Sequence, residues 1–251
     1  MVLKQVFYPN LTTVFDNSSG PEAFTFALID ELVPVIEFLK GHLSVSDDES
    51  VKWILMELTA NAATAPISYT LGRETGLTRD EMLTAIGTSA LWPDLSARSL
   101  SGSSQESVVC IEQVLGISIP EWLSLRLKDR ICLLGLTPES NWVQIRVDID
   151  VQQDCFSLSV VTSFPPLKED IEAIRCRFET PDETTCRIRK ERAAFEDEEG
   201  IYHMPSFTGG GGMGLLACIR LAEKKNLYLD YFSQDLEESG IRFRISNHPI
   251  R

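Results

Sequence analysis

A run of glycines that leads directly into a helix constrains this chain most strongly. Gly209 to Gly212 are consecutive, Met213 and Gly214 follow, and GLLACIRLAEKK continues with helical apolar spacing. Glycine adopts positive φ without strain and lets backbone amides approach a ligand closely. Free amides and the helix dipole both favour an anion at such a helix start. The segment therefore predicts an anion-binding loop, a helix, and then a hairpin of NLYLDYF and IRFRIS around an acidic turn.

The glycines also allow three other interpretations. A P-loop requires a Lys followed by Ser or Thr, and no Lys follows these glycines. Gly209, Gly211 and Gly214 satisfy the spacing GxGxxG, but that motif precedes several βα units in a dinucleotide fold. The residues after Gly214 predict one helix and a hairpin instead. A flexible linker is the third interpretation, and the amphipathic stretch that follows at once argues against it.

A second feature is the stretch ESVKWILMELTANAATAPISYTLG, whose apolar residues follow the helical period. Glu57 and Asn61 are four residues apart and therefore share one face of this helix. A carboxylate can orient a water molecule or accept its proton. An amide oxygen one turn away can bind Mg²⁺. By itself such a pair is also typical of a solvated helix face.

Taken together, in this order along the chain, the two features resemble the GHKL (Bergerat-fold) ATPase superfamily. ELTANA at residues 57–62 looks like the family's N-box, and GGGGMGL at 209–215 looks like its second glycine box. The resemblance covers roughly residues 22–71 and 142–246. The short helix and hairpin at the end are most similar to the histidine-kinase-like ATPase domains of bacterial signalling, which include anti-sigma-factor kinases.

The resemblance implies roles for particular residues. Glu57 would be the catalytic carboxylate that activates water or handles a proton, and Asn61 would bind the nucleotide through Mg²⁺. ATP and Mg²⁺ are the implied cofactors, and the implied activity is that of an ATPase or protein kinase. The implied contacts with the phosphates come from the glycine box, which comprises Gly209, Gly210, Gly211, Gly212, Met213, Gly214 and Leu215.

The chain departs from the family where DxGxG is expected. There the strand FSLSVV at 156–161 leads into Thr162 and Ser163, with no Asp and no Gly. Their hydroxyl groups can accept a hydrogen bond from adenine, but more weakly than a carboxylate does. Thr64 stands where many relatives carry a basic residue. An acidic run, EDEEG at 196–200, shortly precedes the glycines and would repel phosphate unless it faces solvent.

Composition limits the class of partner. The net charge of −14 argues against nucleic acid or an anionic membrane as a primary partner. The chain has no run of 18 apolar residues, so we expect no membrane span. Its six cysteines lack CxxC spacing, so the sequence suggests no zinc site. The simplest interpretation is that they are reduced thiols of a cytoplasmic protein. A protein partner in signalling and a nucleotide are the expected ligands.

The expected fold is α/β (α+β), a two-layer sandwich with a mixed, mainly antiparallel sheet and helices on one face. We expect a single GHKL-like domain over 1–251. Residues 1–20 are expected to be irregular, 73–140 to form a helical insertion, and 180–208 to form a polar lid over the nucleotide. WVQIRVDID and CFSLSVV predict a hairpin.

Two functions remain open from the sequence. The first is a cytosolic ATP-binding GHKL domain that acts in bacterial signalling as a kinase or as a nucleotide-gated regulator. The second is a degenerate, nucleotide-free GHKL fold that serves as a protein-interaction module through its helical insertion. The intact ExxxN and glycine boxes favour the first, and the missing DxGxG favours the second.

Overall fold

The structure is a computed structural model and has an α+β fold. It divides into two compact units, each built from separate stretches of chain. Unit 1 contains residues 1–65, 138–166 and 214–251, and unit 2 contains 66–137 and 167–213. The residues that the structure describes are 1–17, 21–42, 48–91, 102–137, 142–164, 167–193, 214–233 and 241–248.

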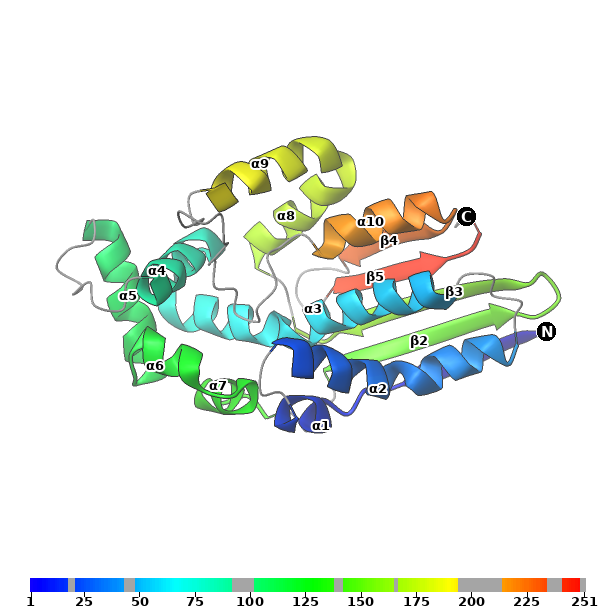
Figure 1. The fold of residues 1–251 in the computed structure, drawn as a ribbon, viewed down its shortest axis with the longest axis horizontal. Coiled ribbons are helices and arrows are strands. Elements are labelled where there is room, and N and C mark those ends of the chain that lie inside the picture. The colour runs from blue at the N-terminus through cyan, green and yellow to red at the C-terminus, as the bar shows by residue number, and fades with distance from the viewer. Residues whose placement is uncertain are drawn as a thin grey trace. The chain divides into compact units, whose positions relative to one another are not determined.

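Unit 1 is built on a five-stranded sheet with the order β1-β2-β3-β5-β4 (Figure 1). Every strand pairing within the described residues is antiparallel, so the expectation of a mixed sheet is wrong. The two hairpins predicted from the sequence, β2–β3 and β4–β5, are confirmed. The strands are β1 (Val2–Phe7), β2 (Val143–Asp150), β3 (Cys155–Thr162), β4 (Tyr228–Ser233) and β5 (Ile241–Ser246).

The N-terminal residues are regular, contrary to the expectation for 1–20. β1 forms an edge of the sheet, with Val2 opposite Asp150 and Phe7 opposite Ile145 on β2. Helix α1 (Leu11–Asp16) follows, and the Asn10 side chain caps it by accepting a hydrogen bond from the Thr13 amide at 3.2 Å. An asparagine in this position satisfies one of the amides that lack a partner within the helix.

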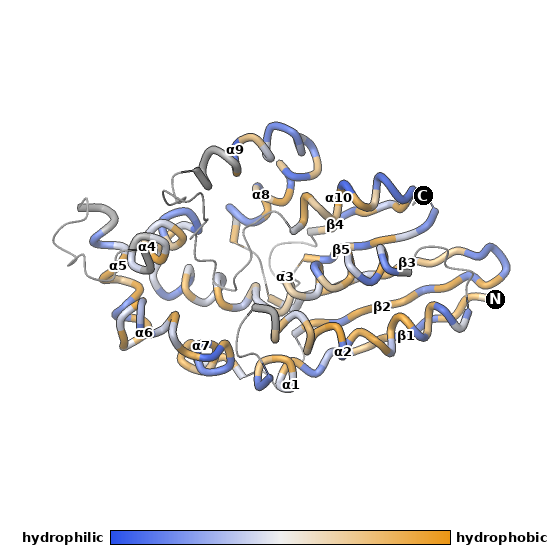
Figure 2. Tube along the Cα trace, viewed as in Figure 1, coloured by the Kyte–Doolittle hydropathy of each residue, from blue (hydrophilic) through white to orange (hydrophobic). Residues whose placement is uncertain are grey.

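The central strands β2 and β3 alternate between the two faces of the sheet. Ile145, Val147 and Leu158 are buried, while Arg146 and Asp148 between them are exposed. This period of two is the signature of a sheet with one face against a core. In Figure 2 the turn that joins β2 and β3 is hydrophilic, in contrast to the hydrophobic residues of β2. One face of the sheet therefore carries the core of unit 1.

Helices α2 (Pro21–Lys40), α3 (Asp48–Thr75, which belongs to unit 1 as far as Ala65) and α10 (Gly214–Lys224) lie over this sheet in Figure 1. Phe7 of β1 and Phe38 of α2 meet edge to face at 5.8 Å between ring centroids. Leu28, Leu32, Ile54 and Leu58 are fully buried. These apolar stripes are what bring the three helices against the sheet.

Unit 2 is helical in its described residues. The helices expected within 73–140 are confirmed, and a further helix, α9, lies within 180–208, the stretch that was expected to form a polar lid. Besides the end of α3, the helices are α4 (Arg79–Leu91), α5 (Gly102–Leu115), α6 (Ile119–Ser124), α7 (Leu127–Leu133), α8 (Lys168–Glu179) and α9 (Pro181–Ala193).

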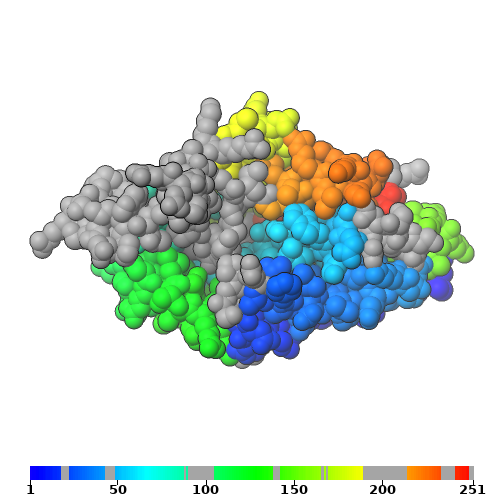
Figure 3. Space-filling view, viewed as in Figure 1, coloured from blue at the N-terminus to red at the C-terminus, as the bar shows by residue number. Residues whose placement is uncertain are grey.

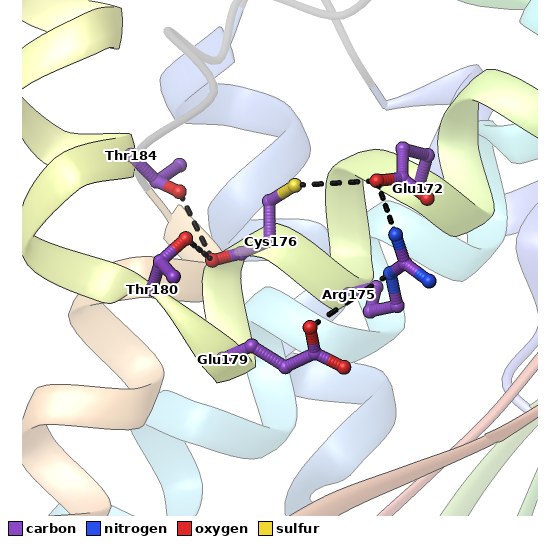
Figure 4. A network of polar contacts seen from close by, with 6 residues as sticks. All are labelled: Glu172, Arg175, Cys176, Glu179, Thr180 and Thr184. Atoms are coloured by element: carbon purple, nitrogen blue, oxygen red, sulfur yellow. Dashed lines mark hydrogen bonds and ion pairs between the residues drawn. The ribbon is translucent and has the colours of Figure 1, made fainter.

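The corner between α8 and α9 is fixed by side-chain hydrogen bonds to one carbonyl. The Thr180 and Thr184 hydroxyls both donate to the Cys176 carbonyl oxygen, at 3.1 and 3.0 Å (Figure 4). Arg175 binds Glu172 at 2.7 Å on the exposed side of the same helix. The last carbonyls of a helix lack partners within it, and both hydroxyls donate to one of them, the Cys176 carbonyl, which the Thr180 amide also meets at 3.0 Å. The polar sequence after Thr180 therefore starts a second helix at once.

A charged cluster is partly buried between α4 and α8 of unit 2. The Arg79 Nε lies 3.1 Å from an Asp170 carboxylate oxygen. Burial raises the pKa of Asp170, and Arg79 acts in the opposite direction. Burial, together with Arg79 and Arg187, lowers the pKa of Arg177 to about 10. This ion pair is a polar link between two helices that are far apart in the sequence.

Candidate functional site

The pair predicted from ExxxN lies on a stripe of α3 in unit 1 whose side chains are exposed or half-buried. Trp53, Glu57 and Asn61 follow one another at intervals of four residues, and Trp53 and Asn61 are exposed. Leu55 and Leu58, on the opposite side, are fully buried in the core. The amphipathic pattern of the helix thus leaves Glu57 and Asn61 together, as their spacing predicts.

The last glycine of the glycine segment lies directly against Glu57. Gly214 is the first residue of α10, and a Cβ atom added to it would collide with the Glu57 carboxylate, 3.2 Å from its Cδ. Only a residue without a side chain leaves the carboxylate where it is. Figure 3 shows the surfaces of α3 and α10 side by side. Two stretches that lie far apart in the sequence therefore meet at the start of a helix.

The carboxylate at this contact is half-buried, and burial raises the pKa of Glu57. One turn further along α10, Cys218 is fully buried. Burial and the nearby Glu57 carboxylate both raise the pKa of the Cys218 thiol. Cys218 is therefore a protonated core residue and not a nucleophile. Glu57 is only half-buried, so of the two groups it is the one that can still exchange a proton with solvent.

Asn61 and Thr64 differ in how much of their side chains is available. Asn61 is exposed, one turn from Glu57, and its amide group faces away from the core. The Thr64 hydroxyl donates to the Ala60 carbonyl at 2.9 Å, a common use of threonine within a helix. Asn61 can therefore offer an oxygen to a cation, while Thr64 is engaged with its own helix.

The predicted adenine contacts lie at the end of β3, in the turn that follows it. Thr162 is buried, and its hydroxyl oxygen accepts a hydrogen bond from the Phe164 amide at 3.3 Å. Ser163 donates from its amide to the Trp142 carbonyl at 2.9 Å, and its hydroxyl lies 3.4 Å from the same oxygen. Both hydroxyls thus contribute to the turn itself. Their role in base binding stays a prediction.

Trp142, which the sequence interpretation missed, connects β2 to α3. Its indole Nε1 donates to the Ala63 carbonyl at 3.2 Å. Its ring meets Phe164 edge to face at 5.8 Å and stacks on Phe15 at 6.1 Å. An indole donor in a buried site generally needs such a partner. A lone tryptophan before a strand gives no sequence signal for this role, because the partner is a backbone atom.

Part of the predicted site lies outside the described residues. The residues outside the description include the acidic run 196–200 and most of the glycine box, namely Gly209, Gly210, Gly211, Gly212 and Met213. Leu215, at the other end of the glycine box, is buried and belongs to the core face of α10. The structure thus brings Gly214 against Glu57, with Asn61 one turn from Glu57 on α3, and it places Thr162 and Ser163 in a turn of the same unit.

The described residues do not gather three or more histidine, cysteine, aspartate or glutamate side chains into a metal-binding group. None of the described helices is both long and apolar enough to cross a membrane. Comparisons with protein-family models, with curated proteins and with solved structures found no match.

Proposed function

We propose that this chain is a cytosolic nucleotide-binding protein of the GHKL type that acts in bacterial signalling, as a kinase or as a nucleotide-gated regulator. The fold that goes with this proposal is a two-layer Bergerat sandwich with α2, α3 and α10 on one face of the sheet. The observation that carries the proposal is the contact of Gly214 with Glu57. It joins the two boxes on which the resemblance rests at one helix start.

The residues at this contact suit a triphosphate and its cation. The N-terminus of α10 favours an anion through its free amides and its dipole. Asn61 supplies one oxygen, which is enough for Mg²⁺, because this ion takes most of its remaining ligands from phosphate and water. The raised pKa of Glu57 suits a group that accepts a proton from water or from a substrate hydroxyl. Bound Mg²⁺ would supply neutralisation of phosphate charge.

Calorimetric titration with ATP and Mg²⁺ tests the proposal. We expect a Kd in the high micromolar range or weaker, because the hydroxyls of Thr162 and Ser163 replace a carboxylate. Losing one charge-assisted hydrogen bond costs about 1.5–3 kcal/mol, or roughly ten- to a hundredfold in affinity. For the same reason, discrimination between ATP and GTP should be weak.

Three variants divide the roles. Glu57→Ala should abolish any ATP turnover while leaving binding, and Asn61→Ala should remove the dependence of binding on Mg²⁺. Thr64→Ala is the matched control, since Thr64 lies on the same helix one turn further and its hydroxyl binds Ala60. If wild type and all three variants behave alike, the pair is a solvated helix face and the proposal fails.

A second candidate, a nucleotide-free interaction module, is favoured by the turn after β3. The Thr162 and Ser163 hydroxyls serve that turn, and Phe164 and Trp142 pack together beside it. The Glu57 carboxylate itself already places a negative charge at the start of α10. Absence of binding at millimolar ATP would favour this candidate.

A further inference from the structure

The other face of the sheet in unit 1 carries three arginines. Arg146 lies on β2, and Arg242 and Arg244 lie on β5. Arg146 is opposite Ser159 of β3, and Ser159 is opposite Arg244, so these three side chains form one row across the sheet. Arg242 is two residues from Arg244 and shares its face. We call this set, Arg146, Arg242 and Arg244, the arginine face.

Within the described residues no ion pair of 4.0 Å or less joins a carboxylate to Arg146, Arg242 or Arg244; the nearest carboxylate by strand register is Asp230 of β4, which lies opposite Arg244. Arg146 donates to the Gln144 side chain at 3.2 Å, and the Arg244 guanidinium lies 4.4 Å from the centre of the Phe232 ring. The Nε atoms of Arg242 and Arg244 are buried and have no hydrogen-bond partner. By contrast, Lys4 of β1 on this face lies 3.6 Å from Asp148.

The three cations also act on one another. Burial, followed by the charges of Arg146 and Arg244, lowers the pKa of Arg242. Such a like-charge group is unfavourable unless an anion joins it. It is also unusual in this chain, whose net charge is −14. A negatively charged partner would relieve the repulsion between these cations.

The spacing of the arginine face indicates the size of that partner. Arg242 and Arg244 are two residues apart on one strand, or roughly 7 Å. Arg146 and Arg244 are two strands apart, or about 10 Å. A single phosphate or carboxylate would require the three side chains to converge on one point, whereas separate carboxylates of a chain segment can meet each position. Alternate carboxylates of an extended acidic chain repeat at about 7 Å and match the spacing along β5.

Apolar side chains beside the arginine face suit a protein segment as well. Phe232 lies opposite Arg242, and Val161 lies opposite Arg242 on the other side. Tyr228, on the same face of β4, is 46% exposed. Aromatic and arginine side chains together are the residues that most often anchor protein interfaces. The surface thus offers both charge and apolar contact area.

We propose that the arginine face is the docking surface for an acidic segment of a protein partner. Its carboxylates would bind Arg146, Arg242 and Arg244, and its apolar side chains would lie against Phe232 and Val161. The surface is on the opposite side of the sheet from α3 and α10, so this proposal does not depend on nucleotide binding. Charge complementarity to a cationic patch on an acidic protein identifies the occupant.

A fluorescein-labelled decapeptide of alternating Glu and Val is a suitable probe, with its anisotropy measured against the full chain. We expect saturable binding that weakens at least fivefold between 50 and 300 mM NaCl, and no binding of the matching Lys and Val peptide. The triple variant Arg146→Gln, Arg242→Gln, Arg244→Gln should weaken binding at least tenfold. The single variant Arg146→Gln, at an exposed position, should weaken it about threefold.

Arg220→Gln is the control, because Arg220 is an exposed arginine of α10 on the other side of the sheet. It should change the affinity less than twofold, with circular dichroism confirming that every variant is folded. The proposal is overturned if the acidic peptide does not bind, or if the folded Arg146→Gln and triple variants bind it as wild type does. It is also overturned if inorganic phosphate at a few millimolar displaces the peptide at constant ionic strength, since the site would then bind a small anion.

Discussion

Glu57 shows how one residue can serve the core and remain available for chemistry. Glu57 belongs to α3, and its carboxylate lies against Gly214 at the start of α10. Burial at this contact raises its pKa, so the neutral form is favoured in the folded chain. The same shift therefore affects both the proton-accepting ability of the side chain and the pH dependence of stability.

Replacement of Glu57 by Gln should remove this pH dependence. Because the folded pKa is raised, wild type has its full stability below the ordinary pKa of glutamate and loses stability as the pH rises through the folded pKa. We expect the urea midpoints of wild type and Glu57→Gln to be similar near pH 4 and the variant to be more stable near pH 7. A wild type that gains relative stability with pH would mean that the α10 dipole outweighs burial.

The contact between α3 and α10 can be tested at the scale of the element by adding a methyl group. Gly214→Ala favours helix formation by up to about 1 kcal/mol, but in wild type the new Cβ must displace the Glu57 carboxylate. We therefore expect the substitution to be more stabilising in a Glu57→Ala background than in wild type. Chemical denaturation of the four proteins of this double-mutant cycle measures the difference.

A coupling energy near zero in this cycle would show that the carboxylate moves away without cost. In that case the glycine would be required by the neighbouring backbone and not by Glu57. Any ATP turnover of Gly214→Ala gives a second readout, since a displaced carboxylate should lower turnover even when stability is unchanged.

The elements that local patterns specify were predictable from the sequence. The α3 stripe that holds Glu57 and Asn61 follows from the helical period, and the two hairpins follow from alternation and turns. The strand β1 was missed because it is a short edge strand whose partner, β2, lies much later in the chain. Helix α9 was missed because PDETTCRIRKERA has few apolar residues.

The candidate site was predictable only in part, for a related reason. The spacing of Glu57 and Asn61 is fixed by the period of a single helix. The path of the chain after β3 depends instead on contacts with distant residues. The Thr162 hydroxyl accepts from Phe164 because of that path, and Trp142 binds a carbonyl of α3. Contacts between a side chain and a distant backbone atom leave no pattern in the sequence.

At the scale of the molecule, the chain passes repeatedly between the two units, so neither unit is one continuous segment. The ion pair between Arg79 and Asp170 lies wholly within unit 2. Arg79→Ala should leave a largely buried carboxylate without its partner, at a cost of about 1–3 kcal/mol.

Hydrogen exchange can show whether that loss stays local. We expect faster exchange in α4 and α8 and unchanged exchange in β2 and β3, as expected if the units open separately. Equal acceleration in both units would show instead that the whole chain unfolds in one step. Arg175→Ala, at the exposed ion pair with Glu172 on α8, is a control that should change exchange little.

The order of the strands also has a consequence for synthesis of the chain. β5 lies between β3 and β4, yet it comes after the other four described strands along the chain. At about 5–20 residues per second, several seconds separate the emergence of β3 from that of β5. During that interval the edge of β3 that will pair with β5 is open on the ribosome. Until β5 has emerged, this open edge can pair with a wrong strand, so the slow step of sheet formation must wait for the C-terminal hairpin.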